Sequence, residues 1–315
     1  MHNYPEDREI CDVSVIMPAY QAALTIGRAL ESIANQTRKP REVVIVDDGS
    51  TDQTCDIVAA FNNKINGVDL RFYQQSNAGA GRARNKAMAE ARGKYLAFLD
   101  ADDEWLPQKL EISLTKLQDN NCDLASHNYY YCDSGRPMPI DCEIIYAASK
   151  EPFVTLYRKG YIATSTVVAR RKTVLAAGGF DESLPNAQDF DFWLEILKAR
   201  NVKFMVFKEL LTNYHVTPNS IMSRTSSRLR CSLIIACRHA HSLKYLRQPV
   251  LPNLWYRIIA VHYETFCSYR NHSRFFSMAL TAIKLPINMI IATAHFYLDK
   301  FKDRRGGAAN SSMSN

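Results

Sequence analysis

Residues 13–34 read VSVIMPAYQAALTIGRALESIA, an apolar run followed by a helical pattern. Val13–Met17 is largely apolar and ends at Pro18, as expected of a buried strand. Behind it, apolar residues recur at the spacing of one helix face: Ile26, Ala29, Leu30, Ile33 and Ala34. The stretch therefore predicts a strand that leads into an amphipathic helix.

The same alternation continues through the first hundred residues. Three further strands are predicted at Glu42–Val46, Leu70–Gln74 and Tyr95–Leu99, with a helix over Ala80–Arg92. Apolar strands that alternate with helices are typical of an α/β fold with a doubly wound, mostly parallel sheet. From residue 105 the patterns are mixed, and beyond residue 224 they are helical.

Composition is that of an ordinary globular chain of 315 residues, with 47% hydrophobic and 23% charged residues. It excludes a wholly disordered chain, a collagen-like chain and a polytopic membrane protein. Residues 1–9 are polar, so we expect no signal peptide. Eight cysteines without a CxxC pair favour reduced thiols in a cytosolic protein over a disulfide framework.

Charge divides the chain into two parts. Residues 224–315 hold 14 Lys and Arg against 3 acids, a net +11, whereas the rest holds 25 against 29, a net −4. We predict an α/β domain at 10–222, a basic helical extension at 223–305 and a disordered low-complexity tail at 306–315.

The basic extension also carries apolar stretches, the longest of which is Phe275–Leu298. Its length of about 24 residues could cross a bilayer. Lys284 and Pro286 lie in its middle, however, and a central lysine is costly in hydrocarbon. We therefore predict peripheral contact with a membrane through 224–305. A helical cap on the core and a contact between copies of the chain are the alternatives.

Polar side chains follow three of the predicted strands, where an open α/β sheet binds its ligands. Tyr20 follows the first strand and Asp47 ends the second. Asp100 and Asp102 follow the fourth, in the sequence Asp-Ala-Asp-Asp. Clustered carboxylates repel one another unless a cation intervenes, and they suit a hard divalent ion such as Mg²⁺ or Mn²⁺. A solvated acidic loop that opens the next helix is the alternative.

Three single residues complete the candidate set. Arg84 lies in a glycine-rich helix entry that could face a pyrophosphate. Asp189 stands at the start of an amphipathic helix, where it is either a helix cap or a fixed general base. His215 is a candidate third metal ligand, although a lone histidine is more often structural.

Together these segments resemble the family 2 glycosyltransferases, inverting enzymes with the GT-A fold that use nucleotide sugars. The resemblance covers residues 12–222 and rests on an ordered set of motifs: VSVIMPAYQ, VVIVDDGSTDQT, QQSNAGAGRARNKA, GKYLAFLDADD, AAGGFDESL and AQDFDFWLEI. Each motif is common, but the ordered set at these spacings is specific to the family.

The resemblance assigns roles to these residues. It implies that Pro18, Tyr20 and Asp47 hold the base, usually uracil in this family, so that the donor would be a UDP-sugar. It also implies that Asp100 and Asp102 form the Asp-x-Asp metal motif, with Asp102 as the direct ligand.

Further along the chain, the resemblance implies that Arg84 helps to bind the diphosphate. It also implies that Asp189 is the catalytic base and that Gly178–Asp181 shapes the acceptor side. Three departures stand out. Gln21 replaces a usual Asn, Gln188 precedes Asp189 where Glu is usual, and His215 and Thr217 replace a usual Arg and His.

We interpret the chain as a bacterial, metal-dependent glycosyltransferase on the cytoplasmic side, acting on a saccharide or lipid-linked acceptor in surface polysaccharide synthesis. A non-catalytic nucleotide-sugar binder is one alternative. A sugar nucleotidyltransferase is another, but it needs a Gly-rich basic loop after strand one, where this chain has PAYQAALT. A nucleic-acid-binding protein is disfavoured because the first 223 residues have no basic stripe.

Overall fold

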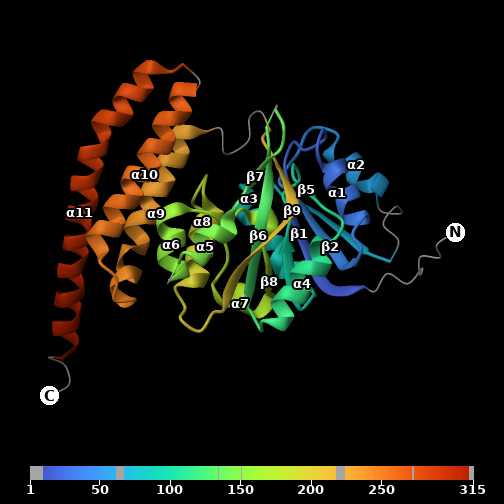
Figure 1. Cartoon of the computed structure of the whole chain (residues 1–315), viewed down its shortest axis with the longest axis horizontal. Helices are drawn as coiled ribbons and strands as arrows, with labels where there is room; N and C mark the ends of the chain where they lie inside the picture. Colours follow the sequence, from blue (N-terminus) through green and yellow to red (C-terminus); the bar gives the residue numbers. More distant parts are fainter. Residues whose placement is uncertain are drawn as a thin grey trace. The chain divides into compact units, whose positions relative to one another are not determined.

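The computed structural model describes residues 10–61, 67–133, 135–149, 151–217, 224–271 and 273–311, with side chains up to residue 298 (Figure 1). Residues 1–9, where we expect no signal peptide, lie outside this set. The chain divides into two compact units, each described here by itself. The first comprises Met1–Pro152 and Tyr161–Ser220, and the second comprises Phe153–Gly160 and Ile221–Asn315.

The first unit is built on one mixed sheet. Its strands are β1 (Cys11–Ala19), β2 (Pro40–Asp47), β3 (Asp69–Gln74), β4 (Tyr95–Phe98), β5 (Glu104–Trp105), β6 (Leu124–Cys132), β7 (Met138–Ile140), β8 (Val168–Arg170) and β9 (Phe204–His215). They lie in the order β3-β2-β1-β4-β8-β6-β9-β5, and β7 pairs with β6. The pairs β3–β2, β2–β1, β1–β4 and β6–β9 are parallel, so the expected α/β sheet is confirmed.

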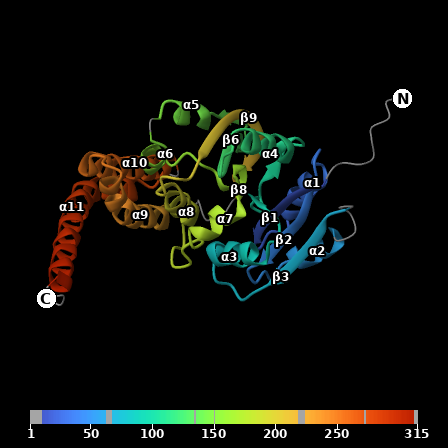
Figure 2. The same cartoon turned by 90° about the horizontal axis from the view of Figure 1, so that it is seen from below.

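Helices cover both faces of this sheet. On one face, α1 (Ile26–Ala34), α2 (Thr54–Phe61) and α4 (Lys109–Asp119) share a buried core with alternate residues of β1 and β2. Figure 2 shows α3 (Ala80–Glu90) on the other face. There α8 (Gln188–Leu197) packs Trp193 edge-on against Phe98 of β4, with ring centroids 5.3 Å apart. Shorter helices are α5 (Cys142–Ala147), α7 (Arg171–Ala176) and the 3-10 turn η1 (Thr164–Thr166).

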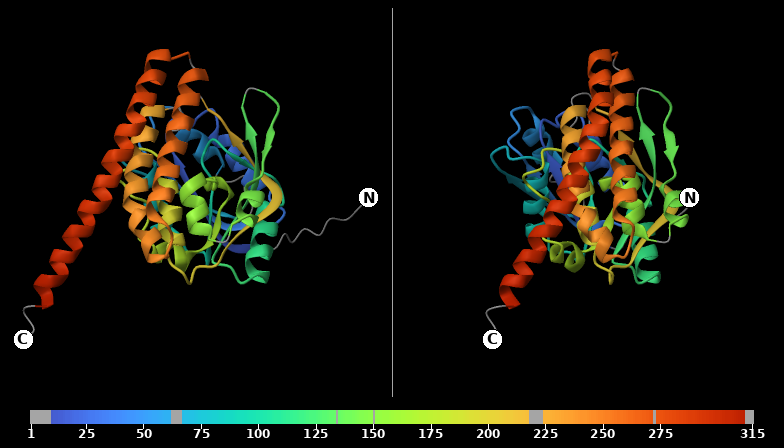
Figure 3. Two further views of the ribbon diagram at one scale, coloured as in Figure 1. Left: turned by 60° about the vertical axis from the view of Figure 1, so that its left-hand side comes forward. Right: turned by 90° about the vertical axis from the view of Figure 1, so that its left-hand side faces the viewer.

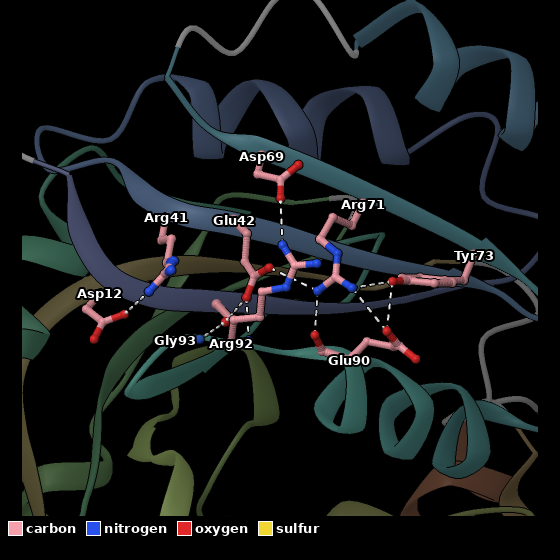
Figure 4. Close-up of polar contacts among 10 residues, drawn as sticks. Asp12, Arg41, Glu42, Asp69, Arg71, Tyr73, Glu90, Arg92 and Gly93 are labelled. Carbon is pink, nitrogen blue, oxygen red and sulfur yellow. Dashed lines mark hydrogen bonds and ion pairs between the residues drawn. The ribbon is translucent and has the colours of Figure 1, made fainter.

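A buried ion cluster fastens α3 to the amino ends of the strands (Figure 4). Glu42 of β2 is 1% exposed and accepts hydrogen bonds from Ser14 Oγ at 2.5 Å and from the Arg92 amide at 2.6 Å. Its second oxygen lies 3.2 Å from Nη1 of Arg71, whose Nη2 reaches Glu90 at 3.0 Å. The cluster therefore holds the end of α3 at the edge of the sheet opposite the predicted site.

The second unit is helical: α6 (Pro152–Lys159), α9 (Thr225–Tyr245), α10 (Val250–Asn271) and α11 (Phe275–Ser311). The chain enters this unit early through α6, where Tyr157 Oη donates a hydrogen bond to the Ala236 carbonyl at 2.8 Å. Arg158 also stacks over Tyr256, 4.0 Å from the ring centroid. Residues 306–311, where we expect disorder, carry helical backbone at the end of α11, and 312–315 lie outside the described residues.

Candidate active site

The carboxyl ends of β1, β2 and β4 meet at one edge of the sheet, because these neighbouring strands run parallel. Pro18 pairs with Val46, and Ala19 pairs with Asp47. Tyr20 follows β1 and is 53% exposed, so its ring is free to stack on a flat ligand. Asp47 is fully buried and accepts hydrogen bonds from the Ser50 amide at 3.1 Å and from Ser50 Oγ at 2.5 Å.

Gln21 joins the loops that follow β1 and β2. Its side-chain oxygen accepts from the amides of Thr51 and Asp52 at 3.1 and 3.2 Å, and its Nε2 donates to Thr51 Oγ1 at 2.9 Å. Gln21 adopts a left-handed backbone, with φ 49°. The replacement of the usual Asn at this position therefore retains an amide that ties the two loops together.

Asp48, directly after β2, binds the glycine-rich entry to α3. Its two carboxylate oxygens accept from the amides of Ala78 at 2.9 Å and Gly79 at 2.8 Å. Gly79 has φ 95°, a conformation that side chains with a Cβ rarely adopt. The entry to the helix that carries Arg84 is therefore fixed to the end of β2.

Arg84 projects from α3 toward the acidic end of β4. Its side chain is 8% exposed, and Nη2 lies 2.6 Å from an oxygen of Asp100. Burial alone would lower the pKa of Arg84, but Asp100, with smaller effects of Asp189 and Asp102, raises it. The guanidinium is therefore charged and is surrounded by the predicted catalytic and metal-binding carboxylates.

Asp102 lies next to Asp100, and the protein offsets the repulsion between the two carboxylates only in part. Burial and the neighbouring Asp100 raise its pKa, and a hydrogen bond from Thr217 Oγ1 at 3.0 Å opposes this rise. Arg84 pairs directly with Asp100 and only weakly lowers the pKa of Asp102, and Arg28 binds the Asp102 carbonyl at 2.7 Å rather than its carboxylate. A divalent cation would relieve the repulsion between the two carboxylates, so the pair fits one.

The third carboxylate of the cluster has a different role. Asp103 is 1% exposed, and one oxygen accepts from Ser165 Oγ at 2.5 Å. The other accepts from the His215 amide at 3.0 Å. Burial, with the charges of Asp102 and Asp100, raises the pKa of Asp103 well above its ordinary value. Asp103 therefore holds η1 and the end of β9 beside the Asp100–Asp102 pair.

His215 lies beside another acid. Its Nε2 is 3.5 Å from Glu104 Oε2, and burial, together with Arg28, lowers its pKa. Within the described part of the chain, no group of three or more His, Cys, Asp or Glu side chains could hold a metal ion. The fit to a cation thus rests on Asp100 and Asp102 alone, with further ligands to come from the substrate.

Asp189 lies in the first turn of α8 and is partly exposed. One oxygen accepts from Thr164 Oγ1 at 3.0 Å and the other from the Phe190 amide at 2.8 Å. Asp189 and the three clustered aspartates all raise the pKa of Tyr214, after the larger effect of burial. Asp189 therefore shares one region of the fold with the acidic cluster, and Thr164 fixes its orientation.

Asn85 connects α3 with the loop that precedes α8. Its side-chain oxygen accepts from the Phe180 amide at 2.8 Å, and its Nδ2 donates to the Phe180 carbonyl at 2.9 Å. Gly179 makes room for this contact, because a Cβ there would lie 2.7 Å from the Asn85 oxygen. The sequence pattern gave Asn85 no role, since its partners lie 95 residues away.

Comparison with known proteins identifies the family. The family model of glycosyl transferase family 2 matches residues 14–176. The chain is a family 2 glycosyltransferase. The relative WfgD of Escherichia coli is 31% identical over 69% of this chain and 82% of its own, and is named a UDP-Glc:alpha-D-GlcNAc-diphosphoundecaprenol beta-1,3-glucosyltransferase. TuaG of Bacillus subtilis, named for teichuronic acid biosynthesis, is 33% identical over 67% of this chain and 81% of its own.

Solved structures confirm the GT-A fold of this glycosyltransferase. Residues 1–349 of TarS from S. aureus match with a TM-score of 0.63 at 22% identity, over 89% of this chain and 80% of that one. A mannosyltransferase from Pyrobaculum calidifontis, solved with GDP-Man and Mn²⁺, matches with a TM-score of 0.58 at 19% identity, over 92% and 88% of the two chains. At these identities the likeness concerns the fold.

Proposed function

We propose that this glycosyltransferase moves a hexosyl or N-acetylhexosaminyl group from a UDP-sugar to a hydroxyl of a lipid-linked saccharide. The reaction would serve surface polysaccharide synthesis at the cytoplasmic face of a bacterial membrane. The observation that carries the proposal is the ion pair of the buried Arg84 with the partly exposed Asp100, next to Asp102, whose pKa is raised by burial and by Asp100. The relative WfgD, named for a UDP-Glc donor and a diphosphoundecaprenol acceptor, supports the choice of substrates.

Residues at the carboxyl ends of the strands bind the donor. Tyr20 stacks on the uracil, Pro18 and Asp47 shape its pocket, and Arg84 attracts the diphosphate. A divalent ion on Asp102 and Asp100, Mn²⁺ or Mg²⁺, would neutralise the diphosphate as it leaves. We place these groups in a catalytic domain at 10–222, followed by the basic extension at 223–305.

Asp189 activates the acceptor hydroxyl. Its carboxylate removes the proton of the acceptor hydroxyl while that oxygen forms a bond to the anomeric carbon. The bond from this carbon to the diphosphate breaks on the opposite face, and its electron pair leaves with the nucleotide diphosphate. A single displacement inverts the configuration, so no covalent glycosyl-enzyme forms. The hydrogen bond from Thr164 holds the carboxylate in one orientation for this step.

The experiment is a thermal-shift screen of nucleotide diphosphates and their sugars with and without Mn²⁺, followed by turnover with the best donor. Asp102→Ala should lose the metal-dependent shift. Asp189→Asn should retain it and turn over about 10²-fold more slowly, the range of a lost general base. Asp119→Ala, at the exposed end of α4, is the matched control and should resemble the parent.

Three results would contradict parts of the assignment. A parent-like shift by UDP and Mn²⁺ in Asp102→Ala would remove that residue from the donor site. Normal turnover of a folded Asp189→Asn would leave Asp189 as a helix-start residue alone. A parent that binds UDP-sugars but releases no UDP with any saccharide acceptor would favour a non-catalytic binder.

A further inference from the structure

Helix α11 of the helical unit turns its apolar side outward. Residues Phe276, Leu280, Ile283, Ile287, Ile290 and Leu298 form one stripe along the helix and are 83, 39, 61, 49, 70 and 62% exposed. Within the described residues, Phe275–Leu298 is the one helical stretch long and apolar enough to cross a membrane, and only 11% of its apolar 18-residue window is buried. An exposed apolar surface of this extent marks an interaction site.

The inward side of the same helix includes polar side chains beside apolar ones such as Phe296, whose ring lies 5.2 Å from that of His241. Figure 3 shows α11 beside α10, and two side-chain hydrogen bonds join them. Trp255 Nε1 donates to Thr293 Oγ1 at 3.0 Å, and Asn288 Nδ2 lies 3.1 Å from His262 Nε2. Because the Nδ1 of His262 bonds the Ile258 carbonyl at 2.7 Å, its Nε2 is the acceptor in the neutral ring.

These contacts limit what can cover the stripe. A helix that crosses a bilayer by itself is apolar all round, whereas α11 packs Asn288 and Thr293 against α10 on one side. Lys284 is exposed at the margin of the stripe, where its ammonium can reach headgroups while the neighbouring isoleucines are inserted. The arrangement suits a helix that lies in the plane of a membrane interface.

Charge decides between the two partners that an apolar stripe could take. The chain from 224 to 315 carries a net +11, and no acidic residue lies between Phe275 and Leu298. Two copies of this basic segment would repel each other, whereas an anionic lipid surface would attract each one. We propose that the outward stripe of α11 inserts into the interface of an anionic lipid bilayer. The proposal is independent of the proposed donor and acceptor.

Vesicle co-sedimentation of the full chain tests it. The chain should bind vesicles of 30% phosphatidylglycerol in phosphatidylcholine at low salt. Binding should fall by about tenfold or more on pure phosphatidylcholine or in 1 M NaCl, where the Debye length is about 3 Å. The double variant Ile283→Glu/Ile290→Glu should bind at least about tenfold more weakly than the parent.

The matched control is Ile144→Glu, which places the same change on α5 at an isoleucine that is 63% exposed. It should bind vesicles like the parent, and both variants should unfold at the parent's temperature because the altered side chains are exposed. Equal binding of the two variants would overturn the proposal. So would a parent that ignores anionic vesicles but forms a dimer that the double variant abolishes, since a second copy would then cover the stripe.

Discussion

Asn85 offers a direct test of how the two halves of the candidate site are held together. Asn85→Ala removes hydrogen bonds of 2.8 and 2.9 Å to the Phe180 backbone and one of 3.0 Å to Glu182. The two backbone bonds contribute about 1 kcal/mol each, and the exposed bond to Glu182 contributes little. We expect the free energy of unfolding to fall by about 2 kcal/mol.

The same change should reach the chemistry through Phe180. Its ring lies 5.4 Å from the Arg84 guanidinium and 4.3 Å, between centroids, from Phe192 of α8. A loosened loop therefore disturbs both the proposed diphosphate ligand and the helix that carries Asp189. If most of the lost energy also orients these groups, kcat/KM falls by about tenfold, since about 1.4 kcal/mol corresponds to a factor of ten.

Urea unfolding and steady-state kinetics with the donor found by the screen measure the two effects. Glu182→Gln, which alters only exposed contacts, the bond to Asn85 and a 3.9 Å ion pair with Arg82, is the control and should match the parent in both. If Asn85→Ala unfolded like the parent, water would replace the Asn85 hydrogen bonds to Phe180 without a loss of stability. Lost stability with unchanged kcat/KM would show that the loop after Gly179 does not orient Arg84 or α8.

Two further predictions concern buried charges of the scaffold. Glu42→Gln should cost about 2 kcal/mol in urea unfolding at pH 7, because it removes the charge of the buried partner of Arg71, which keeps only the half-exposed Glu90. Burial raises the pKa of Glu42, but its bonds to Ser14, Arg92 and Arg71 lower the pKa overall. The stability that the ionised Glu42 contributes is therefore present above about pH 4.5 and is lost on acidification. The unfolding free energies of parent and variant should converge at low pH. Lys109→Met should stabilise the fold by about 1–2 kcal/mol, because the ammonium is fully buried 3.9 Å from the Trp105 ring centroid with no hydrogen-bond partner in the described structure. Burial lowers the pKa of Lys109 well below 10.5, so the free energy of unfolding of the parent rises as the pH approaches 10.5. The difference in stability between variant and parent should therefore shrink. A difference that stays constant from pH 7 to 10 would contradict this reasoning.

Local sequence patterns were sufficient to predict the parallel strands of the sheet and the edge at which their polar residues lie. The apolar runs of β1, β2 and β4 identify buried parallel strands, and parallel strands end at one edge. The proximity of Arg84 to Asp100 follows from this topology, because α3 connects β3 to β4 and begins at that same edge. The neighbours could therefore be predicted from periodicity and strand order.

Contacts across long stretches of chain could not be predicted in this way. The partners of Asn85 lie 95 and 97 residues away, and those of Asp103 lie 62 and 112 residues away. No periodicity reports such pairs, since they depend on how loops fold over the sheet. The same limit applies to α6, a short helix within the catalytic half of the sequence that packs with α9 in the helical unit.

His215 and Thr217, which replace the family's usual Arg and His, support the proposal of a cation at the Asp100–Asp102 pair. Burial and Arg28 lower the pKa of His215, so its ring is neutral near pH 7 and adds no positive charge. Thr217 gives Asp102 one hydrogen bond at 3.0 Å, and Arg84 serves Asp100. A diphosphate that approached this pair would bring further negative charge to a region where burial and Asp100 already raise the pKa of Asp102. If the donor binds at this edge as we propose, a divalent ion held by Asp102 and Asp100 would add positive charge to that of Arg84 without a third side chain.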